Sequence, residues 1–144
     1  MRNSSNTSND PQTEKEIRAF FDEFIQAYPK EDIQRYLDLF QQDENLIMFG
    51  TGQKWLGWEN YKDAPAQERE RFKNIRLTFD WLKVNSHGDV GWVAAKVVVI
   101  LHYEVREIKV PARLTGVVKK IDGSWKIVQG HISTSDKARP NPQQ

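Results

Sequence analysis

Few residues of this chain have the types and spacing that metal or nucleophilic chemistry needs. It has three histidines, His87, His102 and His131, and none belongs to an H-x-H or H-x-x-x-H pair that could hold a metal ion. It has no cysteine, which excludes disulfides, thiolate catalysis and zinc–thiolate sites. We predict no metal and no cofactor.

The remaining candidates have ordinary structural roles as strong alternatives. Asp43 and Glu44 precede a predicted strand and could supply a base, but a solvated helix end explains them as well. His131 can hydrogen-bond to a neighbouring serine or to backbone rather than act in catalysis. The segment 50–52 is too short for a phosphate loop and lacks its lysine. The sequence therefore identifies no complete acid–base set, and the catalytic residues stay unknown.

Two apolar stripes and a proline define the helices expected in the first half of the chain. Thr13 and Glu16 form a capping box that predicts a helix beginning at Thr13 and ending before Pro29. Its apolar stripe comprises Ile17, Phe20, Phe21, Phe24, Ile25 and Tyr28, and a second stripe comprises Ile33, Tyr36, Leu37 and Phe40. The polar pattern of residues 58–72 suits a third helix, and Pro65 predicts a kink or a division into two short helices.

The rest of the chain has the composition of strands. We predict strands over residues 46–49, 75–81, 90–103, 108–121 and 125–133, with turns at 86–89 and 121–124. Pro111 cannot donate to a ladder and predicts a sheet edge or a bulge. Helices followed by long strands predict an α+β domain over residues 13–134. The polar segments 1–12 and 135–144 predict disordered tails.

The order of these predicted helices and strands, together with three local sequence strings, resembles a known superfamily. They are residues 49–58 (Phe49-Gly50-Thr51-Gly52, Trp55 and Gly57-Trp58), residues 113–133 with Asp122-Gly123 and the final Trp125 to Ser133 strand, and, more weakly, residues 88–94. From about residue 14 to 135 the chain resembles the nuclear transport factor 2-like superfamily, closest to its SnoaL-like branch. The resemblance implies three N-terminal helices closing over a strongly curved, mostly antiparallel sheet, as a cone with a pocket. It also implies that two cones pair through their sheets.

Two relatives in that superfamily have functional residues that this chain lacks. By resemblance to ketosteroid isomerase, the base would fall at Met48 or Phe49 and the neutral acid near Gly116 or Val117. The tyrosine of that enzyme would fall at Phe20 or Phe21. By resemblance to the association domain of calcium/calmodulin-dependent protein kinase, the pocket arginines would fall at Gly116 and Ile132. None of these positions carries the required group.

Alternation along the last two strands separates a polar face from an apolar one. Strict alternation places Trp125, Ile127, Gln129, His131 and Ser133 on one face, and Val128, Gly130 and Ile132 on the other. Arg113, on the preceding strand, belongs to a polar face, and Gly116 to an apolar one. Either the apolar face lines the pocket and Arg113, Gln129, His131 and Ser133 face a partner subunit, or the assignment is the inverse.

The function expected from these observations is binding of a small, mainly apolar metabolite by a homodimer. Isomerase, cyclase or hydratase-like chemistry belongs to this expectation; the alternative is a non-catalytic dimerisation or scaffold domain with a vestigial pocket. The candidate ligand-binding residues are Phe24, Tyr36, Phe49, Trp55, Trp58, Gly116 and Ile132. Trp55 and Trp58 flank Gly57 in a segment that we predict to be a mobile lid.

Composition limits the partners. Lys and Arg number 21 against 20 Asp and Glu, and a net charge of +1 gives no global attraction for nucleic acid or an anionic membrane. The longest apolar run, Val97 to Leu101, is far too short for a membrane span, and the N-terminus lacks a secretory signal pattern. We expect a cytoplasmic protein whose partners are a second copy of itself and a small apolar metabolite, with no nucleic acid and no membrane.

Overall fold

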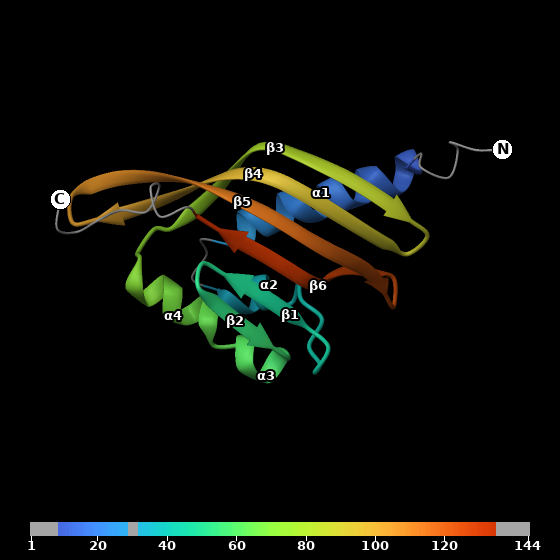
Figure 1. The fold of residues 1–144 in the computed structure, drawn as a ribbon, viewed down its shortest axis with the longest axis horizontal. Coiled ribbons are helices and arrows are strands. Elements are labelled where there is room, and N and C mark those ends of the chain that lie inside the picture. Colours follow the sequence, from blue (N-terminus) through green and yellow to red (C-terminus); the bar gives the residue numbers. More distant parts are fainter. Residues whose placement is uncertain (1–8, 29–31, 135–144) are drawn as a thin grey trace.

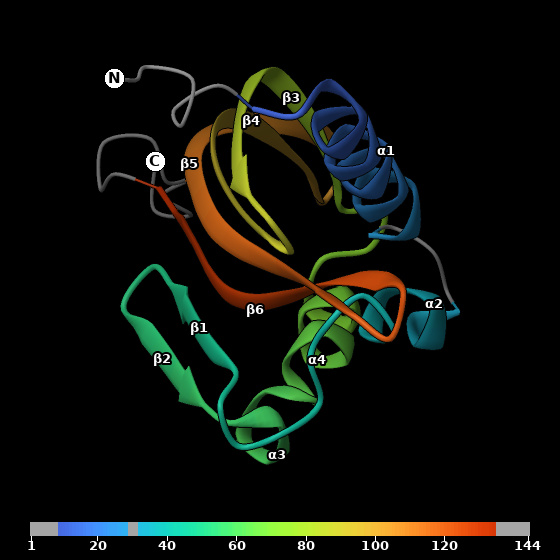
Figure 2. The same cartoon turned by 90° about the vertical axis from the view of Figure 1, so that its right-hand side faces the viewer.

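The computed structural model of the chain describes residues 9–28 and 32–134, which form a curved six-stranded sheet with helices on its concave side (Figures 1 and 2). The strand order is β2-β1-β6-β5-β4-β3, and all neighbours are antiparallel except β1 and β6. The helices are α1 (Pro11–Ala27), α2 (Ile33–Leu37), α3 (Trp58–Tyr61) and α4 (Ala64–Arg71). The strands are β1 (Ile47–Gly50), β2 (Gln53–Leu56), β3 (Arg76–His87), β4 (Val90–Tyr103), β5 (Arg106–Ile121) and β6 (Ser124–Ser133).

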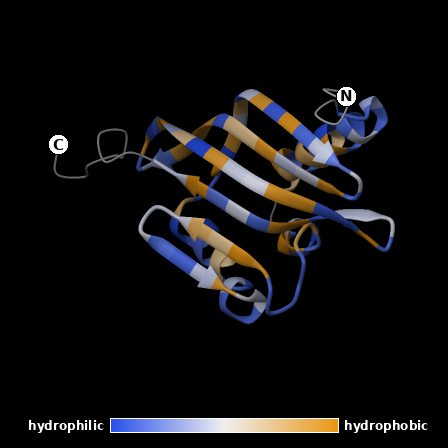
Figure 3. Ribbon diagram, turned by 45° about the vertical axis from the view of Figure 1, so that its right-hand side comes forward, coloured by the Kyte–Doolittle hydropathy of each residue, from blue (hydrophilic) through white to orange (hydrophobic). Residues whose placement is uncertain are grey.

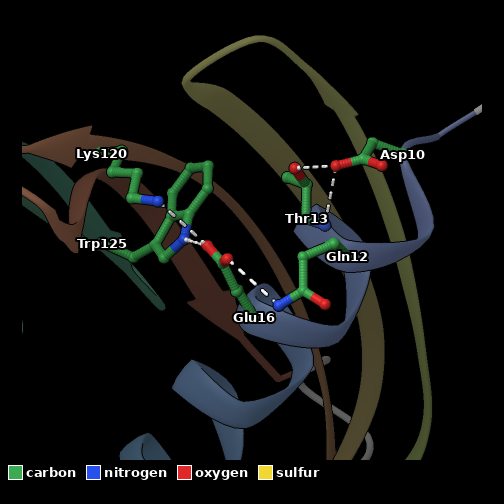
Figure 4. Close-up of polar contacts among 6 residues, drawn as sticks. All are labelled: Asp10, Gln12, Thr13, Glu16, Lys120 and Trp125. Atoms are coloured by element: carbon green, nitrogen blue, oxygen red, sulfur yellow. Dashed lines mark hydrogen bonds and ion pairs between the residues drawn. The ribbon is translucent and has the colours of Figure 1, made fainter.

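Helix α1 begins one half-turn before the predicted cap. Asp10 is the N-cap and accepts from the Thr13 backbone N–H at 3.2 Å, and Pro11 occupies the first turn. The predicted capping box is therefore wrong. Glu16 instead reaches across to the β5–β6 hairpin, where its carboxylate accepts from Trp125 Nε1 at 2.9 Å and Lys120 Nζ at 3.2 Å (Figure 4).

The predicted third helix is divided, as Pro65 indicated. α3 ends at Tyr61, and α4 begins at Ala64 with Pro65 in its first turn, where the missing N–H costs no hydrogen bond. The second apolar stripe forms the short helix α2, which Asp32 caps. Residues 1–8 and 135–144 of the expected tails lie outside the described residues, whereas Asn9 and the N-cap Asp10 precede α1, and residues 11 and 12 begin it.

The strands agree with the predicted ones except around β2 and at the end of β3, which continues to His87, six residues beyond the predicted end and into the predicted turn at 86–89. β4 has the predicted bounds, and Pro111 lies on β5 beyond the last residue paired with β6, where β5 has a neighbour on one side only. The segment around Trp55, predicted to be a mobile loop, is instead strand β2, paired with β1 from Gln53 to Leu56. Gly57 is buried with φ +87°, and its N–H donates to the Leu46 carbonyl at 2.7 Å, so it ends β2 in a fixed turn.

A bulge in β6 changes the face assignment of the last hairpin. Val117 pairs with Gln129 and Val118 with Ile127, which leaves Val128 as the extra residue. Strict alternation fails there, so the predicted placement of Trp125 and Ile127 beside Gln129 and His131 is wrong. They share the concave face with Gly130.

The core lies between α1 and the concave face of the sheet. Hydrophobic and hydrophilic residues alternate along β3 (Figure 3). The largest fully buried side chains are Phe21, Phe40, Ile17, Leu46, Leu77, Val97 and Val118. This arrangement confirms the predicted α+β class, with a strongly curved sheet that does not close into a barrel. None of the helices within the described ranges is long and apolar enough to cross a membrane.

Candidate functional site: the concave face and its aromatic cluster

Two glycines lie side by side on the concave face, and one of them, Gly116, is only half-buried. Gly116 and Gly130 are register partners on β5 and β6, and Leu114 and Ile132 follow them on the same face. A Cβ atom at Gly116 would meet only the Gln129 carbonyl at 3.3 Å and Val93 Cγ2 at 3.7 Å. Gly116 is half-buried, so the concave face is partly uncovered at this point. We call Gly116, Gly130, Leu114 and Ile132 the glycine floor.

The wall beside this floor comes from the β1–β2 hairpin and α3. Met48 pairs with Gly130 on one side and Trp55 on the other, so the three residues share the concave face. Met48 Cε and Sδ lie 3.0 Å from a Cβ built on Gly130. The Trp55 ring meets the ring of Tyr61 edge to face, with centroids 5.4 Å apart. Strand pairing with Met48 and the ring contact with Tyr61 therefore fix the position of Trp55.

A series of aromatic contacts continues from this wall to α1. Tyr61 lies 5.2 Å from Phe40, Phe40 lies 5.2 Å from Tyr36, and Tyr36 lies 5.4 Å from Phe24, all between ring centroids. Tyr28 lies 5.4 Å from Tyr36 in a T-shaped pair. We call these six residues, Phe24, Tyr28, Tyr36, Phe40, Trp55 and Tyr61, the aromatic cluster.

Helix α4 adds a charged pair to the aromatic cluster. The Tyr28 hydroxyl donates to the Glu68 carboxylate. The Arg69 guanidinium lies 5.4 Å from the Tyr28 ring centroid and 5.0 Å from that of Tyr36, as in a cation–π contact. Its two terminal nitrogens donate to the Pro65 and Ala27 carbonyls, both at 3.3 Å, while the buried Nε has no partner among the described residues.

Burial keeps the three phenols of the aromatic cluster protonated. Desolvation raises the pKa of Tyr28, Tyr36 and Tyr61, and for Tyr28 the nearby Glu68 charge raises it further. Tyr36 and Tyr61 also hydrogen-bond to each other through their hydroxyls. At neutral pH these groups are donors and not bases; Tyr28 donates to Glu68 and Tyr36 donates to Tyr61, so the Tyr61 proton is the one left to bind an oxygen atom of an apolar ligand.

The structure brings some predicted site residues together and separates others. Phe24, Tyr36 and Trp55 belong to the aromatic cluster, Gly116 and Ile132 lie on the floor, and Trp58 begins α3 as a partly buried residue packed on the core. Phe49 points to the opposite, convex face, where it is 39% exposed and packs on His131 at 6.0 Å. The convex face also carries Arg113, Gln129, His131 and Ser133, as register and exposure indicate.

Sequence reasoning missed Glu68 and Arg69 of α4 as site residues, and Tyr28, Phe40 and Tyr61 of the aromatic cluster. The alternating charges of residues 68–71 are the pattern of a solvated helix face. Arg69 departs from that pattern, because Pro65, Arg69 and Phe72 at helical spacing face inward. The burial of Pro65 one turn earlier is the signal that places Arg69 inside.

Two surface hollows lie away from the aromatic cluster. One, of about 330 Å³, is lined by Gln41, Asn45, Val117, Lys119, Val128 and Gln129 at the β6 bulge. The other, of about 550 Å³, lies along the outer side of α1 and is lined by Asn9, Pro11, Glu14, Lys15, Arg18, Ala19 and Asp22. Neither contains a residue of the aromatic cluster or the glycine floor.

A curved sheet with an aromatic-lined concave face closed by N-terminal helices defines the cone-shaped proteins of the nuclear transport factor 2-like type. The family model described as SnoaL-like domain matches residues 17–137, and the chain belongs to this family. No curated protein is significantly similar to it in sequence.

Solved structures agree on the fold. A nuclear transport factor 2-like superfamily protein from Salmonella enterica has a TM-score of 0.77 at 16% identity, covering 91% of this chain and 96% of that one. A candidate dehydratase of this family from Streptomyces avermitilis has a TM-score of 0.78 at 14% identity, covering 88% and 99%. A candidate calcium/calmodulin-dependent protein kinase II association domain from Xanthomonas campestris has a TM-score of 0.76 at 19% identity, covering 95% and 99%.

Proposed function

We propose that the protein binds a small, mainly apolar molecule on the concave face, between the glycine floor and the aromatic cluster, and works as a homodimer paired through its sheets. The observation that carries the proposal is the partly uncovered floor at Gly116. Gly116 is only half-buried, whereas Leu114 and Val118 on the same face of β5 are buried, and the one side chain that a Cβ at Gly116 would touch is Val93, at 3.7 Å.

The chemistry of the walls defines the ligand class. Trp55, Met48 and Ile132 offer apolar surface, and the protonated phenol of Tyr61, which accepts from Tyr36, offers one hydrogen-bond donor. A ring or chain that bears one carbonyl or hydroxyl oxygen fits this set. The candidate dehydratase among the similar structures is consistent with a ligand of this kind.

A pair of strand variants tests the site. Gly116→Leu fills the floor, and Thr115→Leu places the same side chain one residue earlier, on the convex face. Against a panel of cyclic ketones, alcohols and phenols followed by tryptophan fluorescence, Gly116→Leu should weaken binding by at least about tenfold. Thr115→Leu should bind as the parent does. Equal affinity in both variants, or no binding by the parent protein across the panel, rejects the site.

A second function is favoured by a separate observation. The aromatic cluster is a continuous series of ring contacts, and its polar groups largely satisfy one another, which is how a solid core is built. This supports the alternative of a non-catalytic dimerisation or scaffold domain. Trp55→Ala separates the two functions: lost binding with near-parental stability favours the ligand site, and a loss of several kcal/mol without any ligand effect favours the scaffold.

A further inference from the structure

The two edges of the sheet differ in length. The edge strand β2 has four residues, whereas the edge strand β3 has twelve. An edge strand presents unpaired N–H and C=O groups, to which a strand of another molecule can hydrogen-bond. A bulge at Asp80 interrupts β3, and the part that follows runs in unbroken register from Trp81 to His87. This second part of β3 is therefore the longest regular stretch of free edge in the sheet.

The side chain of Asn9, just before α1, occupies this stretch of the edge. Its Nδ2 donates to the Val84 carbonyl at 2.7 Å, and its Oδ1 accepts from the Ser86 N–H at 2.9 Å. Successive residues of an antiparallel edge strand direct their backbone groups alternately to the neighbouring strand and to the free edge, and Val84 and Ser86 are two residues apart. A strand added to β3 would hydrogen-bond to these same two groups.

The side chain of Arg18 extends this cover along the edge. Its Nη1 donates to the carbonyl of Leu82, two residues before Val84. The Glu14 carboxylate, one helical turn earlier, accepts from Arg18 Nε at 2.9 Å and so orients the guanidinium. Helix α1 lies beside β3, which brings these side chains to the edge (Figure 2). We call Asn9 and Arg18 the edge clamp.

Burial makes the Asn9 bonds hard for water to replace. Val84 is 3% exposed and Ser86 is 8% exposed, and Asn9 itself is half-buried. Removal of the amide would leave a shielded carbonyl and a shielded N–H without their partner, which favours any other strand that supplies one. Asn9 and Arg18 also line the hollow of about 550 Å³ along α1, so open space reaches the clamp from outside.

We infer that the edge clamp blocks strand addition: it closes the β3 edge to other molecules, and a chain without it associates through this edge. An open edge is a route to aggregation and domain swapping, which proteins prevent with short, bulged or covered edge strands. This sheet has a short β2, a bulge in β3 and side chains over the rest of β3. The inference depends neither on the proposed ligand site nor on the homodimer.

Amide hydrogen exchange followed by NMR, at a concentration below any association, tests whether the clamp is closed in solution. Asn9→Ala should accelerate exchange of the Ser86 N–H at least about tenfold, because the acceptor is removed. Asn60→Ala is the matched control: it removes an amide that donates to the Leu56 carbonyl at 2.7 Å, away from β3, and should leave Ser86 unchanged. Unchanged exchange of Ser86 in Asn9→Ala overturns the clamp.

Sedimentation velocity of the full chain over a concentration series tests the blocking role. Asn9→Ala should form larger species than the parent at equal concentration, and adding Arg18→Gln should increase them, whereas Asn60→Ala should sediment as the parent does. The near-ultraviolet circular dichroism of the larger species should be that of the folded parent. Sedimentation like that of the parent, or larger species only of unfolded protein, overturns the blocking role.

Exchange in the associated protein locates the contact. In the larger species of Asn9→Ala, the Ser86 N–H should exchange slowly again, because a strand of another molecule now accepts it. Association that leaves this N–H in fast exchange uses another surface and overturns the inference.

Discussion

A hydrogen atom in place of a side chain at Gly91 lets α1 approach the sheet closely. A Cβ at this position would lie 2.5 Å from Ile17 Cδ1, 3.2 Å from Val118 Cγ2 and 3.3 Å from the Asn85 carbonyl. Ile17 is fully buried and Val118 is as well, so neither can move aside without displacing the core.

Gly91→Ala should therefore lower the free energy of unfolding by about 1–3 kcal/mol, the usual cost of overpacking. Urea denaturation measures it. Gly116→Ala, on the same face but with no contact below 3.3 Å, should cost clearly less. Equal losses at the two positions would contradict the close approach of α1.

His131 has a different setting from the expected hydrogen-bonded one. It is exposed on the convex face, and its ring packs edge to face on Phe49. His131→Ala should lower the stability of the monomer by only about 0.5–1.5 kcal/mol, the value of an aromatic pair. Phe49→Ala should lose the same stability, and the double variant should lose no more than either single variant. Additive losses of stability would contradict a contribution from this ring pair.

At the scale of elements, one carboxylate joins the first turns of α1 to the β5–β6 hairpin. The Trp125 N–H, then Gln12 and Lys120, lower the pKa of Glu16 below its ordinary value of 4.5. A carboxyl with a lower pKa in the folded state contributes stability above its unfolded pKa, and this contribution is lost as the pH falls through the folded pKa. The hydrogen bonds between Glu16 and the β5–β6 hairpin therefore stabilise the fold at neutral pH, and this stabilisation is lost in acid.

Trp125→Phe keeps an aromatic ring at this position and removes the Nε1–H that donates to Glu16. The difference in unfolding temperature between this variant and the parent should be largest above pH 4.5 and shrink as the pH falls below it. Thermal unfolding followed by circular dichroism at a series of pH values measures this. Trp92→Phe, an exposed tryptophan on the other face, should show a difference that does not vary with pH. A difference that does not vary with pH for Trp125→Phe would show that the hydrogen bond to Glu16 does not contribute to stability.

At the scale of the whole molecule, the convex face predicts association. Its exposed tryptophans, with Phe49 and Leu56, leave apolar surface in water that a second sheet can cover. Light scattering after size exclusion in phosphate buffer should give about twice 16.8 kDa. Trp81→Ser with Trp92→Ser should give the monomer mass, and a parent protein that is monomeric at micromolar concentration would contradict the dimer.

The sequence by itself determined the elements whose signals are local. The apolar stripe of α1, the bounds of β4, the division of the third helix at Pro65 and the Asp122-Gly123 turn follow from side-chain period and backbone freedom, which neighbouring residues control. The same strings were enough to indicate the family. Of the site, Phe24, Tyr36 and Trp55 were predicted from their residue types, and Gly116 and Ile132 from the family resemblance together with strand alternation.

The tertiary structure decided what depends on pairing between distant segments. The extra residue Val128 in β6 reverses the face of every residue before it, and only the register with β5 reveals it. Arg69 turns inward because α4 packs on Tyr28 and Tyr36, more than thirty residues earlier in the chain. The lysines and arginines of the convex face are scattered through a sequence of net charge +1, and they share one face only because the strands of the sheet align in register.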